Sequence, residues 1–256
     1  MALPKRLIGV SLKMYLDPRT TLAWSEQVAD LARRHPAVAG GDVALFVFPA
    51  LPALPSVIDV FAGSGVAVGA QDLFWEDRGP YTGGVSGTDL SEIGCTMVEV
   101  GHMERRRVFG EDEPTVRRKL AAALRNRLLP VLCVGESTPM PPREAAAVCA
   151  AQLGSALAGV TRGPDDSVIV AYEPAWAIGA ERSADSDHIG EVTAALRRWL
   201  GEAGWPSGHA KVIYGGSAGP GLLGTIADSA DGLFLGRSVH EVGALEQVLD
   251  EAMAVA

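Results

Sequence analysis

The sequence predicts an α/β fold in which one domain, residues 1–256, forms a closed (β/α)8 barrel. Eight short apolar runs recur along the chain, and amphipathic or alanine-rich helical stretches separate most of them, a pattern typical of parallel barrels. The 256 residues are 48% hydrophobic and 21% charged, which suits a single compact domain with a sizeable core. An open doubly wound sheet is the alternative, but no G-x-G-x-x-G motif follows the first run.

The predicted strands are runs of apolar, often β-branched residues, which indicate strands buried on both faces. In chain order they are Leu7–Val10, Val43–Phe48, Val66–Ala70, Met97–Val100, Pro130–Val134, Val168–Ala171, Val212–Tyr214 and Leu233–Leu235. Between them, Asp17 before Pro18 predicts the start of one helix, and Asp112 predicts the start of another. The stretches Glu191–Leu200 and Glu241–Met253 are amphipathic and predict two more helices.

Composition excludes several classes of partner. The net charge is -9 without a Lys/Arg run, so we expect neither nucleic acid nor an anionic membrane as a partner. Cys95, Cys133 and Cys149 have no C-x-x-C spacing, which argues against a disulfide framework or a zinc site and leaves Cys133 as a buried packing residue. No signal-peptide pattern or membrane-length apolar run is present, which predicts a cytoplasmic protein.

The most informative stretch is Ala171–Gly179, which follows the apolar run Val168–Ala171. Glu173 stands where a strand ends and a loop begins, and a carboxylate among apolar neighbours there is a candidate general base. Pro174 fixes the backbone behind it, and the following residues have the character of a lid. The alternative is a solvent-exposed glutamate at a strand end.

Cationic and imidazole side chains follow two other strands. Catalytic residues of a barrel lie at the carboxyl ends of its strands. Lys13 is the first cation after the first run, and His102 stands after Gly101 at the end of the fourth. Surface exposure for Lys13 and a structural role for His102 are the alternatives. Glycine-containing turns, 213–219 and 233–238, follow the last two strands, where barrels commonly bind phosphate through backbone N–H groups.

This set of motifs resembles triosephosphate isomerase from end to end, without a large insertion. The resemblance implies the TIM barrel and a role for each matching residue. Lys13 matches the lysine that neutralises substrate charge, His102 the neutral electrophile that shuttles protons, Glu104 the partner of the lysine, and Glu173 the base. Substrate and phosphate contacts are implied for Ser11, Lys13, Gly179, Ser217, Gly236 and the amide of Arg237, and the lid for Pro174, Ala175, Trp176, Ala177, Ile178 and Gly179.

The implied activity interconverts dihydroxyacetone phosphate and glyceraldehyde 3-phosphate. Glu173 removes a carbon-bound proton, and Lys13 and His102 stabilise the enediolate that forms. These two side chains supply the electrophile, so no metal or other cofactor is expected. The family is usually a homodimer in which the loop Gly79–Gly84 docks beside the neighbour's active site, and we expect the same here.

Several residues depart from the family pattern. Ser11 and Tyr15 replace asparagines, Met103 replaces the serine of G-H-S-E-R-R, Gly84 replaces a glutamate in the dimer loop, and Arg237 replaces a glycine. The serine at the Met103 position hydrogen-bonds the base when the lid is open, which methionine cannot do.

The departures leave three functions open. The triose phosphate is the default substrate, and a tetrulose phosphate such as erythrulose phosphate is the alternative. Pocket volume near Met14, Tyr15, Ile178 and Leu235 is expected to decide between the two. A barrel that binds sugar phosphates without catalysis is the third possibility, and the retained Lys13, His102 and Glu173 argue against it.

Overall fold

Parallel strands form the centre of the molecule. The structure is a computed structural model that describes residues 2–256, and within them eight strands close into a barrel in sequence order, with the last paired to the first. They are β1 (Arg6–Ser11), β2 (Val43–Phe48), β3 (Ala67–Ala70), β4 (Met97–Val100), β5 (Leu129–Val134), β6 (Val168–Tyr172), β7 (Ala210–Tyr214) and β8 (Gly232–Leu235). Each coincides with a predicted run to within a few residues, so the predicted barrel is confirmed.

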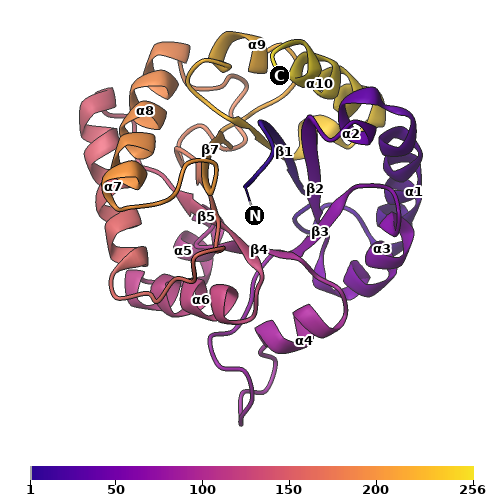
Figure 1. The fold of residues 1–256 in the computed structure, drawn as a ribbon, viewed down its shortest axis with the longest axis horizontal. Helices are drawn as coiled ribbons and strands as arrows, with labels where there is room; N and C mark the ends of the chain where they lie inside the picture. The colour runs from indigo at the N-terminus through magenta and orange to yellow at the C-terminus, as the bar shows by residue number, and fades with distance from the viewer. Residues whose placement is uncertain (1) are drawn as a thin grey trace.

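Helices surround the strands as an outer ring (Figure 1). They are α1 (Pro18–Arg34), α2 (Pro36–Ala39), α3 (Leu54–Phe61), α4 (Gly87–Glu92), α5 (Met103–Phe109), α6 (Glu113–Arg125), α7 (Pro142–Leu157), α8 (Ser186–Glu202), α9 (Leu223–Ile226) and α10 (Val242–Ala254), with short 3-10 turns η1 (Leu51–Ala53) and η2 (Arg237–Val239). Both predicted N-caps are confirmed. Asp17 accepts a hydrogen bond from the N–H of Thr20 at 2.8 Å, and Asp112 accepts one from Thr115 at 2.9 Å.

Side chains alternate between the barrel interior and the layer under the helices, as the two-residue period of a strand requires. The interior cluster is apolar and contains Leu7, Phe46, Phe48, Met97, Val131, Cys133, Ile169, Ala171, Ile213 and Phe234. Large rings fit there because glycines face them: a Cβ on Gly9 would lie 2.2 Å from Phe46 Cε2. Cys133 is fully buried in this cluster, as predicted. The barrel is therefore filled with side chains below its mouth.

Two kinds of feature are absent from residues 2–256. No group of three or more His, Cys, Asp or Glu side chains is placed to hold a metal ion there. In the same part of the chain, no helix is both long and apolar enough to cross a membrane.

Candidate active site

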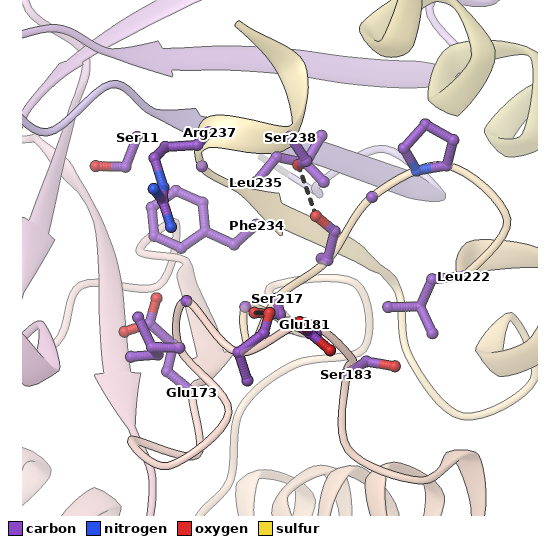
Figure 2. A pocket seen from close by; sticks show the side chains of 18 of the residues that line it. Ser11, Glu173, Glu181, Ser183, Ser217, Leu222, Phe234, Leu235, Arg237 and Ser238 are labelled. Atoms are coloured by element: carbon purple, nitrogen blue, oxygen red, sulfur yellow. Dashed lines mark hydrogen bonds between the residues drawn. The ribbon is translucent and has the colours of Figure 1, made fainter. Parts of the chain in front are cut away.

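A cavity of about 840 Å³ opens at the carboxyl ends of the strands (Figure 2). Inward-facing side chains within the strands fill the apolar interior of the barrel. The polar side chains that follow the strands therefore converge on the cavity at the mouth. Of the residues predicted to form the site, the cavity is lined by Ser11, Lys13, His102, Glu173, Ile178, Gly179, Ser217, Gly236 and Arg237. Segments more than 200 residues apart in sequence thus meet at one site.

Lys13 follows β1 in a left-handed backbone conformation, with φ of 49°. This conformation is unfavourable for a side chain with a Cβ, and Gln71 supports it by donating from Nε2 to the Lys13 carbonyl at 2.9 Å. The Lys13 ammonium lies 2.7 Å from Glu104 Oε1. Burial opposes ionisation of Glu104, but the hydrogen bond and charge of Lys13 hold the pKa of that carboxyl below its usual value. The ion pair therefore holds the ammonium at the cavity.

His102 is the N-cap of α5, and its orientation fixes its tautomer. Its Nδ1 accepts a hydrogen bond from the N–H of Glu104 at 3.1 Å. A nitrogen that accepts carries no proton, so the ring is neutral and its Nε2 holds the hydrogen. Nε2 lies 3.6 Å from Glu173 Oε2. The ring thus presents an N–H donor to the cavity beside the carboxylate.

Glu173 directly follows β6 and is 2% exposed. Its backbone N–H donates to the Val134 carbonyl at 2.8 Å, which anchors the end of the strand. Gly215 leaves room for its side chain, because a Cβ there would lie 2.8 Å from Glu173 Cγ. Within the described chain, Oε2 of this carboxylate is buried without a hydrogen-bond partner. Met103, in place of a serine, supplies none. A buried carboxylate oxygen without a partner can accept a proton from a ligand.

The other side of the cavity consists of backbone. Figure 2 shows Ser11 and Glu173 toward one side and Ser217 toward the other. Within residues 2–256, the N–H groups of Gly179, Ser217 and Gly236 have no acceptor, and all three residues line the cavity. The Arg237 guanidinium adds a positive charge there and lies 5.3 Å from the ring centroid of Tyr15. Unpaired N–H donors and a guanidinium are suited to binding an anion.

The lid segment lies against the loop after β7. Ser217 Oγ donates to the Ala180 carbonyl at 2.9 Å, and the N–H of Ala184 donates to Tyr214 Oη at 2.9 Å. Ile178 and Gly179 line the cavity, but Trp176 does not. Trp176 Nε1 donates to the buried Glu136 at 2.8 Å. Trp176 anchors the lid itself, and Tyr214 anchors the chain that follows the lid, at Ala184.

One expectation about the pocket changes. Met14 is 90% exposed and lies outside the cavity, so it cannot determine pocket volume, whereas Tyr15, Ile178 and Leu235 line the cavity as expected. Glu104 is not among the residues that line the cavity and is paired with Lys13, the partner that the resemblance implies.

Glu99 in β4 is a buried acid that the sequence analysis missed. It is 3% exposed, and its Oε1 has no hydrogen-bond partner among the described residues. Burial raises the pKa of Glu99 well above its usual value, and the charge of Glu173 adds to this, while the Ser11 hydroxyl and Lys13 oppose it. The available signal was one charged residue inside the apolar run Met97–Val100.

We expect Glu99→Gln to be more stable than the parent protein by an amount that grows with pH. The unfolded chain releases the Glu99 proton near pH 4.5, whereas the folded chain keeps it, so the parent loses stability as pH rises above that value. The slope reaches about 1.4 kcal/mol per pH unit until the folded pKa is passed. Urea unfolding of both proteins from about pH 5 to about pH 8 measures it. A difference in stability that does not change with pH would contradict the assignment.

Comparison with known proteins identifies similar chains. The family model described as triosephosphate isomerase matches residues 6–252. An L-erythrulose-1-phosphate isomerase from Pectobacterium atrosepticum is 47% identical over 257 residues, covering 100% of this chain and 98% of the relative. Two triosephosphate isomerases are also similar. The enzyme of Moorella thermoacetica is 42% identical over a match that covers 77% of this chain and 80% of the relative. The enzyme of Citrifermentans bemidjiense is 39% identical over a match that covers 84% of this chain and 85% of the relative.

Proposed function

The chain belongs to the triosephosphate isomerase family, and from this premise we propose that it moves a carbonyl group between adjacent carbons of a small phosphorylated ketose. The observation that carries the proposal is the meeting of Glu173 Oε2, His102 Nε2 and the Lys13 ammonium at one cavity. A base, a neutral N–H donor and a cation at one site provide what proton transfer next to a carbonyl requires.

The proposed reaction is a pair of proton transfers. Glu173 takes the proton from the carbon beside the carbonyl, and the electron pair of that bond forms the enediolate. Lys13 and the Nε2–H of His102 stabilise the oxygen that gains charge. Glu173 then returns a proton to the former carbonyl carbon, while His102 moves the hydroxyl proton from one oxygen to the other. Atoms and charge balance without another reactant.

The phosphate group is proposed to bind at the backbone side of the cavity. Gly179, Ser217 and Gly236, whose N–H groups have no acceptor among the described residues, line the cavity there, and the Arg237 side chain supplies a positive charge. This local attraction matters because the protein as a whole carries a net charge of -9, which repels an anionic substrate at long range. The phosphate thereby fixes which carbons reach Glu173.

Two substrates are candidates. Dihydroxyacetone phosphate would give glyceraldehyde 3-phosphate, the activity expected from the family resemblance. A tetrulose 1-phosphate would undergo the same step and give the 4-phosphate, because the carbonyl moves from C2 to C3. The full-length similarity to an L-erythrulose-1-phosphate isomerase favours this second candidate. The cavity, at about 840 Å³, has room for either molecule, so volume does not decide.

A direct comparison of substrates tests the proposal. Purified protein is given dihydroxyacetone phosphate and both enantiomers of erythrulose 1-phosphate, and kcat/KM is measured for each. Conversion of at least one supports the proposed isomerisation, and the highest kcat/KM identifies the substrate. Failure to convert any of them would contradict the proposed function.

Tyr214→Phe is expected to loosen the lid. The change removes only the hydroxyl that accepts the Ala184 N–H, a hydrogen bond worth a factor of about 3 to 10. We expect kcat/KM to fall by about that factor, and loss of phosphate from the enediolate to rise because water reaches the site. Free phosphate released per turnover measures the second effect. Ser207→Ala, which removes an exposed hydroxyl between α8 and β7, is the control, and equal behaviour of the two variants would contradict the role of Tyr214.

We also propose a homodimer. Several large apolar or aromatic side chains are exposed: Met14 (90%), Tyr15 (53%), Tyr81 (43%) and Phe109 (65%). Apolar surface of this kind commonly marks an interface. Sedimentation at micromolar concentration is expected to give twice the chain mass of 26.7 kDa. Met14→Asp should shift the protein toward the monomer, whereas Met253→Asp, a control in α10, should not. A 26.7 kDa species alone in the parent protein would contradict the dimer.

A further inference from the structure

The mouth of the barrel contains two buried polar side chains that the proposed proton transfers do not use. Ser11 ends β1 and Glu99 lies in β4, and each is 3% exposed. Strand alternation places Glu99 inward, because Met97 belongs to the interior cluster while Val98 and Val100 pack outside the sheet. Both polar groups therefore face the interior of the barrel; Ser11 lines the cavity at the mouth, whereas Glu99 is not among the residues that line it.

In the described part of the chain, neither Ser11 Oγ nor Glu99 Oε1 has a partner at hydrogen-bond geometry, although the Ser11 hydroxyl is near enough to Glu99 to lower the pKa of that carboxyl group. Buried polar groups are nearly always paired, and an exception needs a reason. Glu173 Oε2, the base, is a third such atom in the same region, and its partner is the substrate. Two more free polar atoms beside the base indicate a further polar part of the same ligand.

The protonation of Glu99 adds a donor. Burial and the charge of Glu173 raise the pKa of Glu99 well above its usual value, although Ser11 and Lys13 oppose this. The raised pKa favours the neutral carboxyl group, which can both donate and accept a hydrogen bond. Together with the Ser11 hydroxyl, it can satisfy both the hydrogen and the lone pairs of an alcohol.

The location of these groups selects the part of the substrate. In Figure 2, Ser11 and Glu173 lie to the left of Ser217, near which the phosphate is proposed to bind, and Arg237 is drawn next to Ser11. A ketose phosphate whose phosphate group binds near Ser217 places its reacting carbon at Glu173. A triose phosphate ends at that carbon, whereas a tetrulose 1-phosphate carries one further hydroxymethyl group on it.

We propose that Ser11 and Glu99 form a polar recess that binds the terminal hydroxymethyl group of a four-carbon ketose phosphate. The inference rests on the proposed function and specifies its substrate class. The two residues determine specificity and take no part in the proton transfers. A triose phosphate leaves both groups unpaired, and a site built to hydrogen-bond a hydroxyl discriminates strongly against a substrate that lacks it. The parent protein should therefore prefer the tetrulose phosphate by about 10-fold or more in kcat/KM.

The test compares L-erythrulose 1-phosphate with dihydroxyacetone phosphate in Glu99 variants. Glu99→Leu removes the polar group and is expected to lower the tetrulose-to-triose ratio of kcat/KM by about 10-fold or more. Glu99→Gln keeps a donor and an acceptor in the same shape and should retain the ratio within about 3-fold. Met97→Leu, an inward residue of the same strand, is the control for repacking and should leave the ratio unchanged.

A second variant covers the possibility that Glu99→Leu does not fold. Ser11→Ala removes the other hydroxyl at the cavity surface and is expected to lower the same ratio by about 3- to 10-fold. A parent protein that prefers the triose, or ratios unchanged in both Glu99→Leu and Ser11→Ala, would overturn the recess while leaving the isomerase intact. A parent protein that converts neither substrate would overturn the proposed function and the recess together.

Discussion

Glu173→Gln is expected to lower kcat by about 10²- to 10⁴-fold, the range typical for loss of a general base. Glutamine has the same shape as glutamate, so the buried position near His102 remains filled. It cannot take a proton at neutral pH, so the first step of the reaction is lost. Substrate binding depends mainly on the phosphate side of the cavity, and KM should change much less than kcat.

Steady-state kinetics on the preferred substrate measure this effect. Glu202→Gln makes the same chemical change at an exposed residue at the end of α8 and is the control, with kcat expected within about 2-fold of the parent. If Glu173→Gln retained more than about a tenth of the parent kcat, another group would have to be the base.

Lys13→Met is expected to lower kcat/KM by about 10²- to 10³-fold, as found when one donor to a developing oxyanion is removed. The ammonium is held at the cavity by Glu104 at 2.7 Å and by the constrained backbone at Lys13. Methionine keeps most of the side-chain volume but supplies no charge. Both enediolate stabilisation and attraction of the anionic substrate are lost, so kcat and KM should both worsen.

The loss of the ion pair is a separate effect that needs its own control. Lys13→Met leaves Glu104 unpaired, so the double variant with Glu104→Gln removes that charge as well. Activity should stay low in the double variant because the cation is still missing. Lys5→Met changes an exposed lysine just before β1 and should have little effect. Recovery of activity in the double variant would show that Lys13 serves only to neutralise Glu104.

The strand ends of this fold could be predicted from sequence because the barrel brings them together. Once eight apolar runs are recognised, the residues after each run must meet at one face, and Lys13, His102 and Glu173 do so. The spacing of residues along the chain does not show in which direction each side chain points, however. The outward orientation of Met14 and the hydrogen bond from Trp176 to Glu136 depend on side-chain packing in three dimensions.

Glu99 shows a different limit of sequence reasoning. Alternation within the strand could place it inside the barrel, but its meaning depends on which groups from other strands reach it. Ser11 is 88 positions earlier in the chain (99 minus 11), and only the closed barrel brings both residues to the mouth. A polar pair of this kind becomes visible when hydrogen-bond partners are sought for each buried atom.

The central claim is that Glu173 transfers a proton to and from carbon. Turnover in D₂O, followed by NMR of the product, tests it most directly. In the parent protein, the carbon that was the carbonyl carbon is expected to carry deuterium in a large part of the product, because the proton on the carboxyl group exchanges with solvent before it is returned. The residual turnover of Glu173→Gln should be too slow to show this. Product formed by the parent without any deuterium on that carbon would contradict the mechanism, as would equal deuterium incorporation by the variant at the parent rate.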